Sequence, residues 1–281
     1  MTGQLWLVST PIGNLGDLPP RAVATLRACA LICCEDTRHS GKLLSHAGVA
    51  GVRLAVANEH TEDARTAEVL ELLSDGHDVA VLTDAGTPGI SDPGARLVRA
   101  AIAEGHRVSA VPGPAALVMG LVLSGFDTTR FVFEGFLPRS GKDRTQRIAE
   151  VASERRTIVL YEAPHRVQRT VADLLAACGP DRRIALAREL TKLHEETWRG
   201  TLAEAAVHVA ETDPRGEYVV IVEGASPVVA DASDDAISGA LRMALASGAD
   251  RRTAIATVTT ATGATKRRVY DLALSIPRST S

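Results

Sequence analysis

Glycine- and proline-rich turns are the segments of this sequence whose residue types could bind a ligand. They lie at residues 10–17, 83–94 and 112–116, each directly after a short apolar run that predicts a strand. Glycine allows a ligand to approach the main chain without meeting a Cβ atom. In open α/β sheets, such turns lie at the carboxyl ends of strands, where ligands bind. One turn alone is equally consistent with a tight loop, but turns after consecutive strands predict one shared crevice.

Charged residues follow two other predicted strands. Glu35-Asp36-Thr37-Arg38 comes after residues 31–34, and Arg188-Glu189-Leu190-Thr191-Lys192 comes after residues 184–187. Enzymes with α/β folds place working groups at such positions. We therefore predict Asp36 with Arg38, and next Glu189 with Lys192, as candidate catalytic groups. The alternative for Asp36 is that it only caps the following helix.

The elements that would position these residues alternate between strand and helix in the first half of the chain. Strands are predicted near residues 4–9, 31–34, 53–57, 79–82 and 107–111, which indicates a parallel or mostly parallel sheet covered by helices. We expect Asp92 to cap a helix that has Pro93 at its first position, and Asp17 to cap a helix that begins at Pro19.

The second half predicts a smaller α/β domain with a mixed sheet, followed by a helical module. We place the N-terminal α/β domain at residues 1–125, the second at 126–224 and the module at 234–276, with a polar linker at 138–144. The three short helices of the module resemble a helix-turn-helix arrangement and are locally basic. They predict a reader of the phosphate backbone, although a solvated helical cap is the alternative.

Composition narrows the classes of function. The 281 residues carry a net charge of −3, and aromatic residues make up only 3%, which disfavours broad electrostatic attraction to nucleic acid and extended base-stacking platforms. The four cysteines form no Cys-x-x-Cys pair, and no metal-ligand spacing occurs, so we predict no metal. Neither G-x-G-x-x-G nor a Walker sequence is present. We expect no export signal, no membrane insertion and a cytoplasmic location.

The motifs together resemble the ribosomal RNA small subunit methyltransferase I family, within the tetrapyrrole methylase superfamily. The matching segments are LVSTPIGNLG at 7–16, EDTR at 35–38, TDAGTPGISDPG at 83–94, PGPAA at 112–116, GFLP at 135–138, YEAPHR at 161–166, RELTK at 188–192 and residues 216–224. One departure is Asn58-Glu59-His60-Thr61, where the family tends to have Asn in the last position.

This resemblance implies an S-adenosylmethionine-dependent enzyme that methylates the ribose 2′-hydroxyl of a cytidine in 16S ribosomal RNA. It also implies two α/β domains with the cofactor in the cleft between them, a homodimer, and 16S rRNA or the small ribosomal subunit as partner. Carried over by motif, the implied cofactor contacts are Thr10, Pro11, Asp84, Gly86, Thr87, Ile90, Pro114, Ala115, Ala116, Tyr161 and Glu162.

Two other functions remain open from the sequence. A methyltransferase of the same superfamily could act on a tetrapyrrole instead, although a small anionic macrocycle does not require the basic C-terminal module. A non-catalytic ribosome assembly factor would bind RNA without binding the cofactor. The likeness of fold supports the cofactor more strongly than the substrate.

Overall fold

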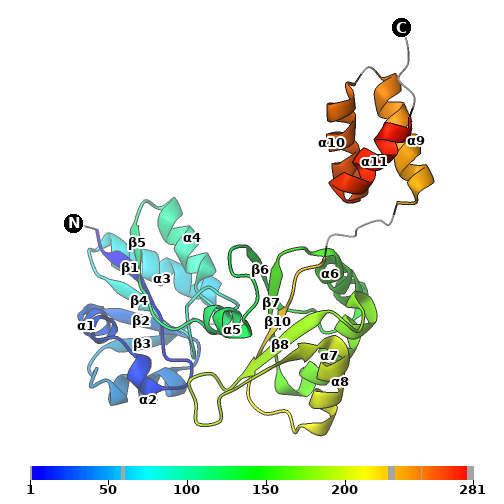
Figure 1. The fold of residues 1–281 in the computed structure, drawn as a ribbon. Coiled ribbons are helices and arrows are strands. Elements are labelled where there is room, and N and C mark those ends of the chain that lie inside the picture. Colours follow the sequence, from blue (N-terminus) through cyan, green and yellow to red (C-terminus); the bar gives the residue numbers. More distant parts are fainter. Residues whose placement is uncertain (1, 58–60, 227–231, 248, 277–281) are drawn as a thin grey trace. The chain divides into compact units, whose positions relative to one another are not determined.

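A computed structural model describes residues 2–57, 61–226, 232–247 and 249–276 of the chain (Figure 1). The chain divides into two compact units, residues 1–224 and residues 225–281. The first unit contains two five-stranded sheets, and the second is helical. The further division of the first unit at residue 125 stays a prediction.

The first sheet is fully parallel, as the alternating pattern predicted. Its order is β3-β2-β4-β1-β5, and its strands are β1 (Gln4–Val8), β2 (Leu31–Cys34), β3 (Arg53–Val56), β4 (Val79–Val81) and β5 (Arg107–Val111). On one face pack α3 (Glu62–Ser74) and α4 (Ala95–Ala103), and on the other pack α1 (Pro20–Ala28) and α2 (Thr37–His46). Because strand side chains alternate, Cys33 and Cys34 enter opposite cores.

The second sheet is mixed, which confirms that prediction. Its order is β6-β7-β10-β8-β9, and its strands are β6 (Phe131–Phe136), β7 (Thr157–Glu162), β8 (Arg183–Arg188), β9 (Glu196–Thr201) and β10 (Tyr218–Val222). β6 and β7 are parallel, whereas the remaining pairs are antiparallel. The edge strand β9 was not predicted, because its polar sequence ETWRGT lacks the apolar run that marked the others.

Helices cover both faces of the second sheet. One face carries the core formed with α6 (Gly141–Ser153), α7 (Pro164–Cys178) and α8 (Leu202–Glu211). The opposite face is covered by α5 (Ala116–Ser124), whose Leu117 and Leu121 pack on Val159 and Val219. Because α5 directly follows β5 of the first sheet, the chain places the last turn of that sheet beside the second one (Figure 1).

Two predicted helix starts are wrong. The helix after the central turn is capped by Gly94, with φ of 123°, so Asp92 and Pro93 belong to the preceding loop. Asp17 lies in the short 3₁₀ helix η1 (Leu15–Asp17), which Asn14 caps, while Pro19 occupies the N-cap of α1 without a side-chain bond. In both places the residues that were predicted to cap or begin the helix lie in a turn that precedes it.

The predicted linker at 138–144 is also shorter than expected, since α6 begins at Gly141. Arg144 is only 3% exposed, and its guanidinium contacts the Asp173 carboxylate at 2.7 Å and the Thr170 hydroxyl at 3.0 Å. A partly buried ion pair thus holds a segment that the sequence alone predicts as a polar linker.

The helical module consists of α9 (Asp234–Ala246), α10 (Arg251–Thr262) and α11 (Lys266–Ser275), with a core of its own. Ser233, Asp250 and Thr265 cap the three helices, and each accepts a hydrogen bond from a backbone N–H of the first turn. In the described parts of both units, no helix is long and apolar enough to cross a membrane.

Candidate functional site

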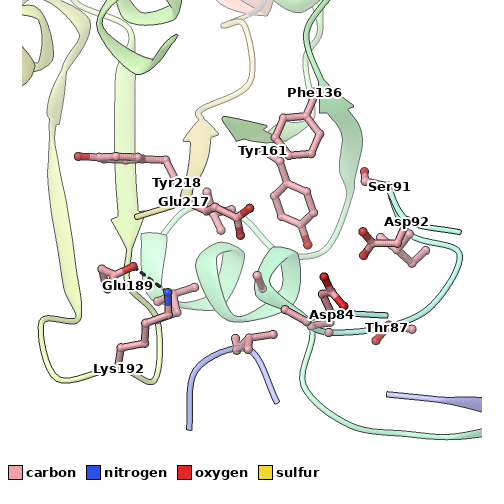
Figure 2. A pocket seen from close by; sticks show the side chains of 18 of the residues that line it. Asp84, Thr87, Ser91, Asp92, Phe136, Tyr161, Glu189, Lys192, Glu217 and Tyr218 are labelled. Atoms are coloured by element: carbon pink, nitrogen blue, oxygen red, sulfur yellow. Dashed lines mark hydrogen bonds and ion pairs between the residues drawn. The ribbon is translucent and has the colours of Figure 1, made fainter. Parts of the chain in front are cut away.

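A cavity of about 270 Å³ lies where the glycine-rich turns of the first sheet meet the second sheet (Figure 2). Its lining is Ile12, Glu35, Asp84, Ala85, Gly86, Thr87, Ile90, Ser91, Asp92, Ala115, Ala116, Phe136, Tyr161, Glu189, Leu190, Lys192, Glu217, Tyr218 and Val219. Both halves of the first unit therefore contribute to one site.

Hydrogen bonds between the turns hold this cavity open in a defined shape. Thr10 and Gly86 exchange backbone hydrogen bonds of 2.8 and 3.2 Å. The Thr87 hydroxyl donates to the Pro114 carbonyl at 3.2 Å. Gly86 has φ of +85°, a conformation that other residues adopt only with strain. The three turns are thus joined into one rigid wall, which supports the prediction of a shared crevice.

Five carboxylates line the cavity, namely Glu35, Asp84, Asp92, Glu189 and Glu217, and of these Glu189 is paired with Lys192. Burial, together with the charges of Glu35, Glu217 and Asp84, raises the pKa of Asp92 to about 7. Burial also raises the pKa of Glu35. Such shifts show that negative charge here is poorly compensated by the protein itself.

Asp84 provides a second indication that the cavity binds a positively charged ligand. Its Oδ1 atom is buried and has no hydrogen-bond partner within the described part of the chain. Buried polar atoms are nearly always paired, so an unpaired carboxylate oxygen in a cavity indicates a ligand that supplies a donor or a positive charge. Figure 2 shows Asp84, Asp92 and Glu217 around the same space.

Glu189 and Lys192 form an ion pair at one side of the cavity, with 2.8 Å between Lys192 Nζ and Glu189 Oε1 (Figure 2). Two glycines make room for the pair. A Cβ atom at Gly216 would lie 1.9 Å from Glu189 Oε1, and one at Gly13 would lie 2.4 Å from Lys192 Cγ. The absence of a side chain at Gly216 therefore leaves room for Glu189, and its absence at Gly13 leaves room for Lys192.

Backbone strain is concentrated beside the same cavity. Among the described residues other than glycine, positive φ angles occur at Ser91, Glu189 and Thr191. Ser91 and Glu189 line the cavity, and the Thr191 hydroxyl accepts a hydrogen bond from the Asn14 backbone at 3.1 Å. Strained residues persist where surrounding structure over-determines them, most often at functional sites.

Aromatic rings close another side of the cavity. The Tyr161 ring lies 4.9 Å from that of Phe133 and 5.7 Å from that of Phe136, measured between centroids. Its hydroxyl accepts a hydrogen bond of 3.0 Å from the Leu117 backbone N–H, at the start of α5. Burial raises the Tyr161 pKa, so the hydroxyl stays neutral. Tyr161 thus offers a planar apolar surface beside the carboxylates.

The structure brings most of the predicted site residues together. Of the residues implied to contact cofactor or to act in catalysis, those that line the cavity are Asp84, Gly86, Thr87, Ile90, Ala115, Ala116, Tyr161, Glu189 and Lys192. Thr10 and Pro114 lie behind the wall and hold its turns. Pro11 is buried and is not part of the lining.

Glu162 and the pair Asp36–Arg38 do not line the cavity. Glu162 is 1% exposed, and its carboxylate accepts a hydrogen bond of 2.6 Å from Thr170 and pairs with Arg166. Asp36 caps α2, and its hydrogen bonds from Arg38 lower its pKa to about 2. The capping alternative therefore describes what Asp36 does in this structure, and its catalytic role stays a prediction.

Several lining residues were missed as site residues. They are Ile12, Glu35, Ser91, Asp92, Phe136, Leu190, Glu217, Tyr218 and Val219. Asp92 was assigned to a helix cap, and Glu35 was passed over in favour of its neighbour Asp36. A signal existed in part, since every one of these residues stands inside a segment that carries the family resemblance. Asn58, Glu59 and His60 lie outside the described residues.

The family model "Tetrapyrrole (Corrin/Porphyrin) Methylases" matches residues 4–206, so the chain belongs to the tetrapyrrole methylase family. Solved structures share this fold. The chain superimposes on uroporphyrin-III-C-methyltransferase from Thermus thermophilus with a TM-score of 0.54, at 22% identity, covering 80% of this chain and 94% of that one. The methyltransferase CobJ gives a TM-score of 0.60 at 21% identity, covering 80% and 95%.

Sequence identity to named proteins shows which group within this family the chain belongs to. A Synechocystis protein named ribosomal RNA small subunit methyltransferase I is 44% identical over 275 residues, which is 98% of each chain. Proteins of the same name from Xylella fastidiosa and Escherichia coli O157:H7 are 48% and 41% identical, over 80% and 84% of this chain and 82% of each relative. Within the tetrapyrrole methylases, this chain belongs to the ribosomal RNA small subunit methyltransferase I group.

Proposed function

We propose that this enzyme transfers a methyl group from S-adenosylmethionine to the ribose 2′-hydroxyl of a cytidine in 16S ribosomal RNA. Its relatives are named as methyltransferases of small-subunit ribosomal RNA. The observation in the structure that carries the proposal is the cavity lined by five carboxylates, one of which, Asp84, leaves a buried oxygen unpaired.

The residues of the cavity fit this cofactor. S-adenosylmethionine carries a sulfonium and an ammonium, and both are stabilised by uncompensated carboxylates such as Asp84 and Asp92. Ala115 and Ala116 leave space, and Tyr161 provides a flat surface for an adenine ring. When bound, the cofactor supplies an electrophilic methyl group. The chain supplies orientation of that group relative to the hydroxyl, which by itself lowers the barrier substantially.

A ribose hydroxyl is a weak nucleophile, so its proton must be accepted as it attacks. Glu189 can accept that proton, and the Lys192 ammonium can stabilise the developing alkoxide. This assignment is supported by the strained backbone of Glu189 and by the glycines that accommodate the pair. Asp36 with Arg38 is the other candidate pair, but neither residue lines the cavity.

Two further features belong to the proposal. We infer a homodimer, supported by the exposed apolar residues Val118, Met119, Val122 and Leu123 along α5. A cytoplasmic location follows from the proposed substrate, the small ribosomal subunit. The family resemblance implies the homodimer, and the sequence pattern predicts the location; sedimentation and cell fractionation measure them directly.

Calorimetric titration with S-adenosylmethionine tests the cavity assignment. Asp84→Asn should weaken binding at least tenfold because it removes the unpaired charge, and Ala115→Leu should abolish binding by filling the cavity. Ala103→Leu adds the same volume at an exposed position at the end of α4, outside the cavity lining, and serves as the matched control. Unchanged affinity in both cavity variants, with unfolding temperatures like that of the parent, would show that the cofactor binds elsewhere.

Transfer to RNA is measured separately, with a tritiated methyl group on S-adenosylmethionine and the small ribosomal subunit as acceptor. Label should appear at a cytidine 2′-oxygen, which resists alkaline cleavage. Label on a base would overturn the 2′-O assignment. Cofactor binding without any transfer to ribosomal RNA would favour a tetrapyrrole acceptor, whereas RNA binding without cofactor binding would favour an assembly factor.

A further inference from the structure

One face of α11 in the helical module is exposed and combines basic side chains with an aromatic ring. Lys266, Tyr270 and Leu274 follow one another at four-residue spacing, and Arg267 neighbours Tyr270 at three-residue spacing. We name these four residues the α11 stripe. Tyr270 is 50% exposed and Leu274 56% exposed, in a chain where only 3% of residues are aromatic.

The opposite face of α11 fixes this orientation. Val269 and Ala273 are fully buried in the core of the module, together with Ile276. The Thr265 hydroxyl caps the helix by accepting from the Arg268 backbone N–H. Rotation of the helix would expose that core, so the ring of Tyr270 is held outward by the fold.

The basic residues of the module divide into two groups. Arg268 pairs with Asp234 at 2.8 Å, and Arg251 donates to the Ile276 carbonyl at 2.7 Å, so both join elements of the module. Lys266 and Arg267 are exposed and form no ion pair within the described part of the chain. Arg242 on α9 and Arg252 on α10 are exposed as well, so Lys266 and Arg267 are the exposed cations that share a helix with Tyr270.

We propose that the α11 stripe binds a single-stranded segment of RNA, with Tyr270 stacked on an unpaired base and with Lys266 and Arg267 on the adjacent phosphates. This inference rests on the proposed function, which supplies the RNA. Unpaired bases stack on exposed aromatic rings, and neighbouring cations neutralise the backbone. A protein partner would gain from Tyr270 and Leu274 but would have to cover two hydrated cations, so the charges favour RNA.

The test measures binding of the full-length chain to a 16S rRNA transcript at several salt concentrations. Tyr270→Ala and Tyr270→Leu should each weaken binding about tenfold, because neither residue stacks, whereas Tyr270→Phe should bind like the parent. Lys266→Ala and Arg267→Ala should each weaken binding and reduce the slope of log affinity against log salt by about one. Lys142→Ala removes an exposed cation from α6 and should change neither value.

Each contrary result overturns the inference in a recognisable way. Full affinity in Tyr270→Leu would replace stacking with plain apolar contact. Full affinity for the transcript in Tyr270→Ala, with loss of affinity for the assembled small subunit, would assign the stripe to a ribosomal protein. Calorimetry with S-adenosylmethionine is run on the same variants. Absent cofactor binding would refute the proposed function while leaving the RNA result interpretable by itself.

Discussion

At the scale of single residues, the site depends on charge that the protein leaves uncompensated. Asp92 illustrates this most clearly, because burial and its three carboxylate neighbours raise its pKa from the ordinary 3.8 to about 7. Between about pH 4 and pH 7 the unfolded chain has lost this proton while the folded chain retains it. The free energy of unfolding therefore falls as the pH rises through that window.

Asp92→Asn should remove this penalty. We expect the variant to unfold at a higher temperature than the parent at pH 8, with the difference shrinking towards pH 4, where both side chains are neutral. Asp127→Asn is the matched control of opposite sign, because hydrogen bonds from Thr129 lower the pKa of Asp127. That variant should lose stability at neutral pH. A difference for Asp92→Asn that does not change with pH would contradict the argument.

Asp92 also links pH to cofactor binding. A bound cation favours the charged form of the carboxyl and lowers its pKa, so binding should release a proton near and below pH 7. Affinity for S-adenosylmethionine should rise with pH through this range. Calorimetry in two buffers of different ionisation enthalpy measures the released proton, and Asp92→Asn should abolish the release.

At the scale of elements, α5 determines whether the second half of the cavity stays in place. It packs on the second sheet through Leu117 and Leu121, and Gly120 allows the close approach. A Cβ atom at Gly120 would lie 2.7 Å from Val219 Cγ1 and 2.9 Å from Val219 Cβ. Because Val219 lines the cavity, displacement of α5 would alter the site as well as the core.

Gly120→Ala should therefore lower the free energy of unfolding by about 1–3 kcal/mol through overpacking. Gly239→Ala is the matched control, since nothing lies within 4 Å of a Cβ built at that helical glycine, and it should raise stability by about 0.5–1 kcal/mol. Urea unfolding measures both values. Equal changes in the free energy of unfolding for the two substitutions would show that α5 and β10 leave room for a Cβ atom at Gly120.

The backbone conformation of Gly86 makes this residue a poor position for testing cofactor binding at the central turn. A bulky residue at Gly86 would block the cavity, but φ of +85° there means that any side chain also strains the bridge to Thr10. Loss of cofactor binding in such a variant would have two causes. Ala115 has no such constraint, with φ of −142°, and gives the cleaner experiment.

At the scale of the whole molecule, the two units should carry separable functions. Residues 1–224 contain the entire cavity, and the helical module has its own core. Deletion of residues 225–281 should leave affinity for S-adenosylmethionine within about twofold of the parent. It should weaken binding to 16S rRNA at least tenfold, because the α11 stripe is removed. Unchanged affinity for RNA would refute a role of the module in RNA binding.

The sequence alone determined the class of fold and much of the cavity wall. The strand pattern predicted a parallel sheet and then a mixed one, because buried strands need local runs of β-branched residues and turns need glycine and proline. Those are local requirements, visible in single segments such as 79–94. Motif resemblance then specified the family and, together with the charged residues that follow the strands, about half of the residues that line the cavity.

Only the tertiary structure decided which charged residues share the site. Asp36 and Glu35 are neighbours in sequence, yet Glu35 lines the cavity while Asp36 caps a helix. Glu217 and Asp84 belong to different sheets, and no local pattern relates them. Their proximity, and the raised pKa of Asp92 that results, depends on how α5 and the three turns bring two sheets together. Charge coupling is a property of distance in space, which single segments do not encode.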